Sequence, residues 1–389
     1  MNIAFCYENV VPSRGGCETY IADLARRLTG DGHEIHLYAC RWDAAALPES
    51  MHYHSLQVPR GPRFLRPWRF GAACARALRG ARHDVSIGFD KTWGQDLLYP
   101  QGGLHAASAA YNLRKYSNRL ERGLARVAKA LDLAHWSFTL LERKQYLGSN
   151  RPLVVVNSDM VRHHFQQYYG ISATDLRVVR SSIDPDRFLE PDRPRRRLEA
   201  RQHWGIDPEE TVALFAAMNY RLKGLGPLLH AVKLLPAERR FRLLVVGNPR
   251  IRAYEKLALR LGVADRVCFA GHCADMRNGY FVADFLVHPT FYDPCSLVIL
   301  EALACGLPVV TTRANGASEL LHPPQEGYVV SDPHDHERLA WCMIQLLDAS
   351  RRAACARAAR QTAAQWTFDQ HYRQLLQAIT DAAARRRAA

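Results

Sequence analysis

Short apolar runs alternate with stretches of helical periodicity along this chain, and this alternation limits the fold more than any other feature. The apolar runs occupy residues 3–7, 85–89 and 153–156 in the first half and 212–215, 241–246, 267–269, 285–288 and 309–311 in the second. Short buried strands separated by helices are typical of parallel sheets covered on both faces. The sequence therefore predicts an α/β protein with two doubly wound, Rossmann-like domains.

The domain boundaries follow from length and from breaks in the pattern. A chain of 389 residues suggests two or three domains at about 150 residues each. Proline and charge interrupt the pattern near residues 183–194, where Asp184-Pro185-Asp186 is interpreted as a turn. We expect domains over 1–186 and 187–365, then a C-terminal helix over 366–389 whose last residues, AAARRRAA, are expected to fray.

The net charge of +14 favours an anionic partner, which can be nucleic acid, a phosphorylated small molecule or an anionic membrane. The chain has no GxxxxGK[ST] loop, no GxGxxG after the first strand, and no zinc-finger or RNA-reading motif. These absences argue against a phosphate-loop ATPase, a dinucleotide enzyme and a nucleic-acid-binding protein.

The N-terminus and the cysteines indicate a cytoplasmic chain. No apolar run is long enough to span a membrane, and MNIAFCYENV lacks the features of a signal peptide. The ten cysteines are scattered, so no disulfides are expected. Cys268, His272 and Cys273 lack a fourth ligand at a suitable spacing, so we expect no metal there.

A basic segment from Leu113 to Leu133 repeats apolar residues at intervals of three and four, with Arg and Lys between them. This pattern predicts an amphipathic helix. Its apolar stripe packs either on its own domain or against an anionic membrane surface, where each basic residue contributes about 1 kcal/mol.

Residues 287–312 carry the most informative motif. Asp293 is expected in a loop after a strand, and residues 296–305 are expected to form a helix ending at Gly306. The first amides of that helix, from Cys295 to Leu297, would form an anion site. Glu301 follows Asp293 by eight positions, where it can accept hydrogen bonds from hydroxyls. The alternative is a solvated Asp and an ordinary helix Glu.

The segment DPCSLVILEALACGLPVVTT resembles the signature of the retaining glycosyltransferases of family 4, also called glycosyl transferases group 1. Other segments match the family in order: Gly15-Gly16 with Glu18, then NYRLKGLGPLLHAV, VVGNP and VCFAGHC. The resemblance covers nearly the whole chain. It implies the GT-B fold, in which an acceptor-binding N-terminal domain and a nucleotide-sugar-binding domain face a central cleft and the C-terminal helix crosses back to the N-domain.

The resemblance also implies roles for individual residues. Arg221 and Lys223 would neutralise the donor diphosphate, and Asp293 would bind hydroxyls of the transferred sugar. The most similar members carry an Asp in the loop that here reads YPQGGLH, where this chain has Gly102 or Gly103. His105 is therefore expected to take over sugar contacts.

The remaining donor contacts are implied in the same way. Glu301 would bind the ribose, and Gly15 and Gly16 would allow close approach of the backbone to phosphate. His272 and Cys273 would border the base, and the amides of Cys295, Ser296 and Leu297 would hold phosphate oxygens.

The activity implied is transfer of a hexose, glucose from UDP-glucose foremost, to a lipopolysaccharide-core or other envelope glycan. The transfer would retain the anomeric configuration and need no metal or permanently bound cofactor. The enzyme would be peripheral on the inner face of the cytoplasmic membrane and bind no nucleic acid. The alternatives are a mannosyl- or N-acetylhexosaminyltransferase that uses another nucleotide sugar, and a non-catalytic glycan-binding protein.

Overall fold

The chain forms two compact units, each built on its own parallel sheet. The computed structural model describes residues 1–12, 16–148, 151–188 and 190–388. One unit comprises Met1–Ala110, Asn118–Arg180 and Asp369–Ala389, and the other Tyr111–Ser117 and Ser181–Phe368. The prediction of two parallel α/β units is confirmed.

The first unit has a seven-stranded sheet in the order β5-β3-β1-β6-β7-β8-β9, with all neighbours parallel. Its strand order reverses between β1 and β6, which makes this the switch point where ligands of doubly wound sheets bind. The strands are β1 (Asn2–Cys6), β3 (Glu34–Ala39), β5 (His52–Ser55), β6 (Val85–Phe89), β7 (Leu97–Tyr99), β8 (Leu153–Val156) and β9 (Leu176–Val178), beside the small pair β2 (Asn9–Val10) and β4 (Arg41–Trp42).

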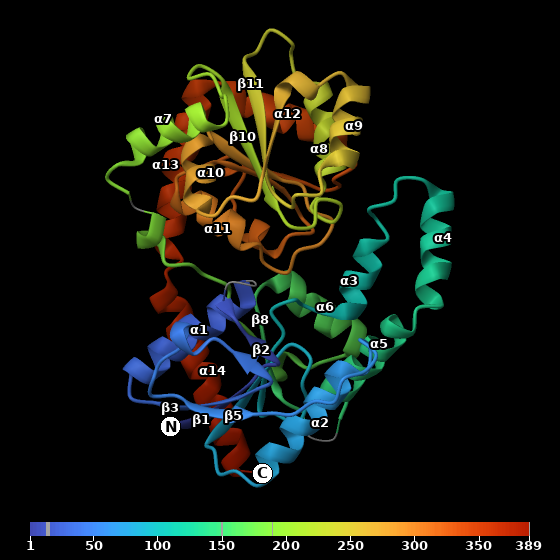
Figure 1. Cartoon of the computed structure of the whole chain (residues 1–389), viewed down its shortest axis with the longest axis vertical. Helices are drawn as coiled ribbons and strands as arrows, with labels where there is room; N and C mark the ends of the chain where they lie inside the picture. Colours follow the sequence, from blue (N-terminus) through green and yellow to red (C-terminus); the bar gives the residue numbers. More distant parts are fainter. Residues whose placement is uncertain (13–15, 149–150, 189, 389) are drawn as a thin grey trace. The chain divides into compact units, whose positions relative to one another are not determined.

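Helices cover this sheet, which explains why its central strands are largely apolar (Figure 1). The helices of the unit are α1 (Gly16–Gly30), α2 (Arg66–Arg79), α3 (His105–Asn112), α4 (Arg119–Ala130), α5 (Leu133–Tyr146), α6 (Asp159–Tyr169) and α14 (Phe368–Ala388), with the 3₁₀ turns η2 (Ala44–Ala46) and η3 (Ala173–Asp175), and of these α4 does not lie on the sheet.

The C-terminal helix α14 packs within the first unit. His371 lies 2.6 Å from the Tyr20 hydroxyl, and the Tyr372 hydroxyl donates to Asp31 at 2.6 Å. The expected fraying of the tail is wrong, because α14 continues to Ala388. Arg385 pairs with Asp175 at 3.0 Å and Arg386 with Asp96 at 2.9 Å, and these ion pairs tie down the last turns.

The second unit has a six-stranded parallel sheet in the order β12-β11-β10-β13-β14-β15, with its switch point between β10 and β13. The strands are β10 (Thr211–Ala217), β11 (Phe241–Gly247), β12 (Val267–Gly271), β13 (Phe285–His288), β14 (Val309–Thr312) and β15 (Gly327–Val330). The helices are α7 (Arg193–His203), α8 (Leu225–Lys233), α9 (Arg252–Leu261), α10 (Met276–Val282), α11 (Leu297–Ala304), α12 (His336–Leu347) and α13 (Ala349–Gln365), with η4 (Pro185–Phe188), η5 (Ala264–Arg266) and η6 (Gly316–Leu320).

The predicted helix over 113–133 is wrong in extent. Asn118 caps α4, whose residues run only from Arg119 to Ala130, and Asp132 caps a separate helix, α5. In both caps the side chain accepts a hydrogen bond from the second helical amide, which starts a new helix. Figure 1 shows α4 standing away from the sheet of its unit, and none of its residues is buried.

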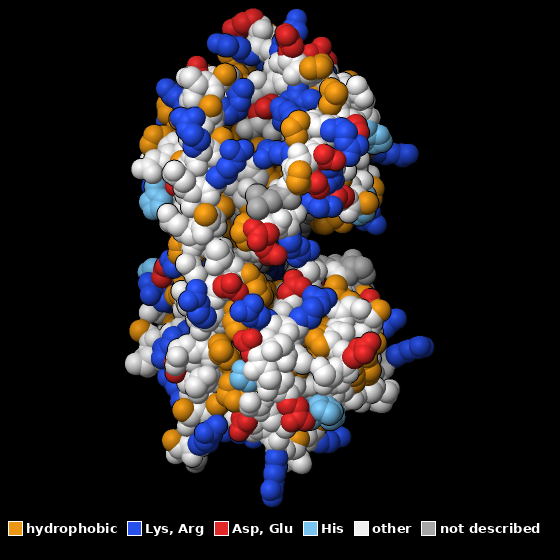
Figure 2. All heavy atoms as spheres, turned by 90° about the vertical axis from the view of Figure 1, so that its left-hand side faces the viewer, with side chains coloured by type: hydrophobic (Ala, Val, Ile, Leu, Met, Phe, Trp, Pro, Cys, Tyr) orange, Lys and Arg blue, Asp and Glu red, His pale blue; other side chains and the backbone are white. Residues whose placement is uncertain are grey.

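Other expectations can be compared directly. All ten cysteines are described and none forms a disulfide, as predicted. None of the described helices combines the length and the apolar character that a membrane span requires. On the face shown in Figure 2, basic side chains are scattered and mixed with acidic ones.

We expect Asp284→Ala to destabilise the second unit. Asp284 pairs with Arg197 at 2.7 Å and with Arg201 at 3.1 Å, and it accepts the Val212 amide at 2.8 Å. The Arg201 side chain is 3% exposed, so its charge would stay buried without an ionic partner, and the free energy of unfolding falls by about 3 kcal/mol. Chemical denaturation measures this loss.

Glu199→Ala is the matched control, because Glu199 pairs with Arg195 on an exposed surface. We expect a change below about 0.5 kcal/mol. Equal losses of unfolding free energy in Asp284→Ala and Glu199→Ala would contradict the view that the buried charge of Arg201 depends on Asp284.

Candidate active site

Two loops meet at the switch point of the second sheet, one after β10 and one after β13. The Phe291 amide donates to the Leu222 carbonyl at 2.9 Å, which joins the loops through their backbones. Gly224 has a φ of 82°, and a Cβ there would lie 2.1 Å from the Pro289 carbonyl oxygen. Only glycine therefore allows this close approach.

The joined loops bring two predicted site residues into an ion pair. The Lys223 ammonium donates to the Asp293 carboxylate at 2.5 Å and to the Tyr292 carbonyl at 3.3 Å. Burial alone would raise the pKa of Asp293, but the Lys223 charge and then the His288 ring outweigh burial. The pKa of Asp293 is therefore held well below its usual range, and its carboxylate stays ionised.

His288 is a site residue that the sequence reasoning missed. It is the last residue of β13, 1% exposed, and its Nε2 lies 3.9 Å from Asp293 Oδ2. Burial lowers the pKa of His288 despite the nearby carboxylate, so the ring is neutral at physiological pH. A polar residue at the carboxyl end of a strand beside the switch point is the signal that could have found it.

The start of α11 differs in one respect from the prediction. Ser296 precedes the helix as its N-cap, and its amide donates to the Asn315 side chain at 3.2 Å. The expectation of bare amides from Cys295 to Leu297 is therefore wrong for Ser296. Asn315 is fully buried after β14 and also accepts the Ala317 amide at 3.1 Å, so it fixes the loop in front of the helix.

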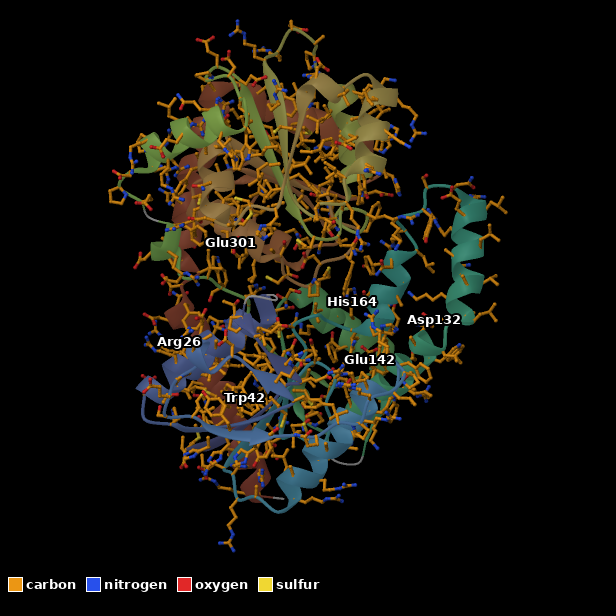
Figure 3. All side chains as sticks on the ribbon, viewed as in Figure 1. Arg26, Trp42, Asp132, Glu142, His164 and Glu301 are labelled. Atoms are coloured by element: carbon orange, nitrogen blue, oxygen red, sulfur yellow. The ribbon has the colours of Figure 1, made fainter. Side chains whose placement is uncertain are left out.

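Glu301, labelled in Figure 3, lies on α11. It borders a cavity of about 480 Å³. The cavity is also lined by Arg187, Phe188, Asp275, Met276 and Arg277. The Tyr280 hydroxyl donates to Glu301 Oε2, and no hydrogen bond among the described residues involves Oε1. Burial raises the pKa of Glu301, with Tyr280 and Arg187 partly opposing it.

Arg221 lies on the same loop as Lys223 but makes different contacts. Its guanidinium stacks over the Tyr116 ring, 4.3 Å from the ring centre. The segment that carries Tyr116 also places Tyr111 against Tyr292, with ring centres 5.4 Å apart. The structure thus puts Arg221, Lys223 and Asp293 in one region, with the Arg221 side chain exposed.

His272 and Cys273 follow β12 at the same carboxyl edge of the sheet. His272 is exposed, and the Cys273 thiol donates to the Asp275 carbonyl at 3.0 Å, beside the cavity that Glu301 borders. Cys295 is buried, and burial raises the pKa of its thiol to about 12, so it is neither a thiolate nor a nucleophile.

The first unit has its own cavity at its switch point, of about 660 Å³, lined by residues that follow β1 and β6, including Tyr7, Glu8, Asp90 and Lys91. Asp90 is a second residue that the sequence reasoning missed. It has a φ of 58°, and its loop is held by the Gln145 side chain, which donates to the Asp90 and Thr92 carbonyls. Burial raises the pKa of Asp90.

Asp90 lies beside the loop YPQGGLH, which lacks the acid that the resemblance implies. The Gly102 amide donates to Asp90 Oδ1 at 3.4 Å, and a cavity of about 230 Å³ is lined by Asp90, Gly102, Gly103 and His105. His105 Nε2 lies 2.9 Å from His135 Nδ1. Burial, then His135, lowers the pKa of His105 to about 4, so the ring is neutral.

The glycine-rich first loop is only partly described. Gly15 lies outside the described residues, while Gly16 is the exposed first residue of α1. Glu18, two positions further, lines the larger cavity of the first unit.

Two doubly wound sheets, one with cation- and carboxylate-bearing loops at its switch point, define the GT-B class of fold. Family models match two parts of the chain: Glycosyltransferase Family 4 over residues 14–187 and Glycosyl transferases group 1 over residues 209–349. A D-inositol 3-phosphate glycosyltransferase 2 of Catenulispora acidiphila is 33% identical over 370 residues, 87% of this chain and 83% of that protein. The chain belongs to glycosyltransferase family 4, also called glycosyl transferases group 1.

Two further relatives show how far the likeness extends. The lipopolysaccharide glucosyltransferase WaaG of Escherichia coli is 26% identical over 366 residues, 93% of this chain and 94% of that protein. A crystal structure of WaaG has a TM-score of 0.78 at 24% identity, covering 97% of this chain and 99% of that one. Anabaena HepE in complex with UDP-glucose has a TM-score of 0.72 at 18% identity, covering 98% and 100%.

Replacing Lys223 by Met is expected to reverse the pKa shift of Asp293. In the native protein the lowered pKa contributes stability above about pH 4, which is lost as the pH falls through the folded pKa. Without the ammonium, burial dominates and raises the pKa of Asp293 above its ordinary value. The unfolding free energy of the variant then rises as the pH is lowered from neutral towards about 5.

A ¹³C NMR titration of the Asp293 carboxyl measures the shift directly. Lys256→Met on exposed α9 removes the same charge elsewhere and should leave Asp293 unchanged. A low Asp293 pKa in Lys223→Met would show that the ion pair is not the cause.

Proposed function

We propose that the protein is a retaining, metal-independent hexosyltransferase that moves glucose from UDP-glucose to a lipopolysaccharide-core or other envelope glycan. The observation that carries this proposal is the Lys223–Asp293 pair at the switch point, on the same strand edge as Glu301. At that edge the donor diphosphate would meet the Lys223 ammonium, and the donor hydroxyls would meet the carboxylates of Asp293 and Glu301. The likeness to WaaG supports glucose and the glycan acceptor, and the UDP-glucose complex of HepE supports the donor.

Each donor part has a counterpart in the second unit. Lys223 and Arg221 bind the diphosphate, Asp293 accepts hydroxyls of the transferred sugar, and Glu301 accepts ribose hydroxyls through Oε1. The cavity of about 480 Å³ beside Glu301 takes the base, with the Phe188 ring on its wall.

The reaction follows from these charges. The bond between the anomeric carbon and the donor phosphate oxygen breaks, and the acceptor oxygen bonds to that carbon on the same face. The acceptor proton passes to the leaving phosphate. Negative charge grows on the phosphate as the bond breaks, so Lys223 and Arg221 stabilise the transition state more than the bound donor. The lysine and arginine side chains supply the positive charge that a metal ion supplies in other transferases.

We assign the acceptor to the switch-point cavity of the first unit, with Asp90 as the carboxyl that positions its hydroxyl. Asp90 contacts the Gly102 amide in the loop where the most similar family members carry an acid. The neutral His105 borders the adjoining cavity and is placed to accept a hydrogen bond there. This assignment adds Asp90 to the prediction that His105 takes over sugar contacts.

We further assign α4 to the surface of an anionic membrane. Leu120, Leu124 and Val127 lie on one helical face and are 70%, 64% and 60% exposed. No residue of α4 is buried, which supports this assignment over packing of the stripe on its own domain. An exposed apolar stripe flanked by Arg119 and Arg126 matches an interfacial helix, which would hold the enzyme at the inner face of the cytoplasmic membrane.

The donor is tested with purified protein and a panel of UDP-, GDP-, ADP- and TDP-sugars, recording nucleotide release. We expect release from UDP-glucose, unaffected by EDTA. Lys223→Ala should lower the rate about 100-fold, and Glu301→Gln should weaken nucleotide binding about tenfold because one charged acceptor is lost. Proton NMR of the transferred sugar should show a retained anomeric configuration.

The controls separate the alternatives. Asp90→Asn should release nucleotide without acceptor at the native rate and lose transfer to a heptose-containing acceptor. Release from GDP-mannose or a UDP-N-acetylhexosamine would replace the glucose assignment. A protein that bound no donor and still bound glycan would be the non-catalytic alternative.

The membrane assignment is tested by sedimentation with phosphatidylglycerol vesicles. Arg119→Gln/Arg126→Gln should weaken partitioning about 30-fold, at about 1 kcal/mol for each basic residue. Arg252→Gln/Lys256→Gln removes the same charge from exposed positions on α9 and should bind like the native protein. Equal losses in both double variants would show a net-charge effect and contradict a role of α4.

A further inference from the structure

Three histidines and a glutamate gather on one face of the first sheet, at the amino-terminal ends of β3 and β5. Glu34 is the first residue of β3, and His36 is two residues further on, so their side chains share a face. The parallel pairing of β3 with β5 places His52 opposite His36 and His54 opposite Tyr38. The cluster lies at the opposite end of the strands from the switch-point cavity.

Three of these side chains converge on one point. Glu34 Oε1 lies 3.3 Å from His36 Nε2 and 3.0 Å from His52 Nε2. The rings of His36 and His52 stack with centres 4.6 Å apart and planes 20° apart, so both nitrogens face the same carboxylate. Within the described parts of the chain, this is the group of three such residues whose ligand atoms all lie within 4.8 Å of one another.

The spacing fits a tetrahedral metal ion. With metal–ligand bonds of about 2.0–2.1 Å, neighbouring ligands of a tetrahedral zinc lie about 3.3 Å apart. The two measured nitrogen–oxygen distances are close to this value. Two imidazoles and one carboxylate are also the ligand types that zinc, nickel and copper accept.

Hydrogen bonds behind the cluster orient the rings. His36 Nδ1 lies 2.9 Å from His54 Nε2, and the His54 ring stacks on Tyr38 with centres 4.4 Å apart. The Tyr38 hydroxyl lies 2.8 Å from His83 Nε2. When Nδ1 of His36 donates to His54, its Nε2 lone pair is directed to the convergence point. Outer partners of this kind orient the histidine ligands of metal sites.

The three converging side chains remain accessible: His36 is 14% exposed, His52 53% and Glu34 52%.

We propose that Glu34, His36 and His52 bind one divalent transition-metal ion, with zinc as the ion that best fits the spacing. The ion would connect β5, the edge strand of the sheet, to β3. It would stabilise the folded first unit in proportion to the occupancy of the site. The site lies outside the donor and acceptor regions, so the proposal does not depend on the proposed transfer reaction, and it assigns this metal no part in catalysis.

The test uses the full chain without a histidine tag and zinc chloride alone, followed by titration calorimetry. We expect one zinc per chain and a thermal unfolding midpoint that rises with zinc. His36→Gln/His52→Gln should weaken binding by at least about 100-fold and remove the rise, and Glu34→Gln should weaken binding about tenfold. Glu34→Gln keeps the test valid if the double variant does not fold, because its side chain is half exposed.

Two controls make the result specific. His163→Gln changes an exposed histidine on α6 and should bind zinc like the native protein. His230 and His336 stack with centres 4.8 Å apart in the second unit. Zinc binding that survives the loss of His36 and His52, falls in His230→Gln, or is absent from the native chain would overturn the proposal.

Discussion

The partly buried ion pair between Lys223 and Asp293 is the contact on which the site of the second unit depends. It joins loops that are 70 residues apart in sequence, and it keeps a carboxylate ionised where burial would otherwise protonate it. Neither charge is stable there without the other, because an unpaired charge in that position costs several kcal/mol. The glycine at 224 and the Leu222 carbonyl hold the loops together, so the ion pair has a fixed position at the strand ends.

The switch point of the first sheet carries a carboxyl whose pKa is shifted in the opposite direction. Asp90 follows β6 as Asp293 follows β13, but burial dominates at Asp90 and raises its pKa. Lys91 lies over the Phe138 ring, 4.1 Å from its centre. Carboxyls whose environments drive their pKa values apart are suited to different tasks. The contrast is the one expected of the proposed roles, in which Asp293 binds the donor as a carboxylate and Asp90 positions the acceptor hydroxyl.

Two further features lie away from the strand ends that hold these sites. The helix α4 exposes both its apolar stripe and its basic residues, and the cluster of Glu34, His36 and His52 sits at the amino-terminal end of its sheet. Each has a physical reason to bind a partner: α4 leaves most of its apolar stripe exposed, and the cluster directs three metal-ligating atoms at one point. A fold of this kind therefore offers surfaces that its transfer site does not use.

Local pattern by itself determined the main strands and the α11 motif with Asp293 and Glu301, because these depend on residues close together in the chain. It did not identify β5, β7, β9 or β15, which are short, and His52–Ser55 has no apolar alternation. Only the tertiary structure decided that Lys223 meets Asp293, that Asp90 reaches Gly102, and that His36 lies opposite His52. The same is true of Arg385 and Arg386, whose ion pairs with Asp175 and Asp96 order a tail that composition alone predicts to fray. These contacts join residues that lie apart in the sequence. Pairing of neighbouring parallel strands brings the first three together, and packing of α14 in the first unit brings the arginines to their partners.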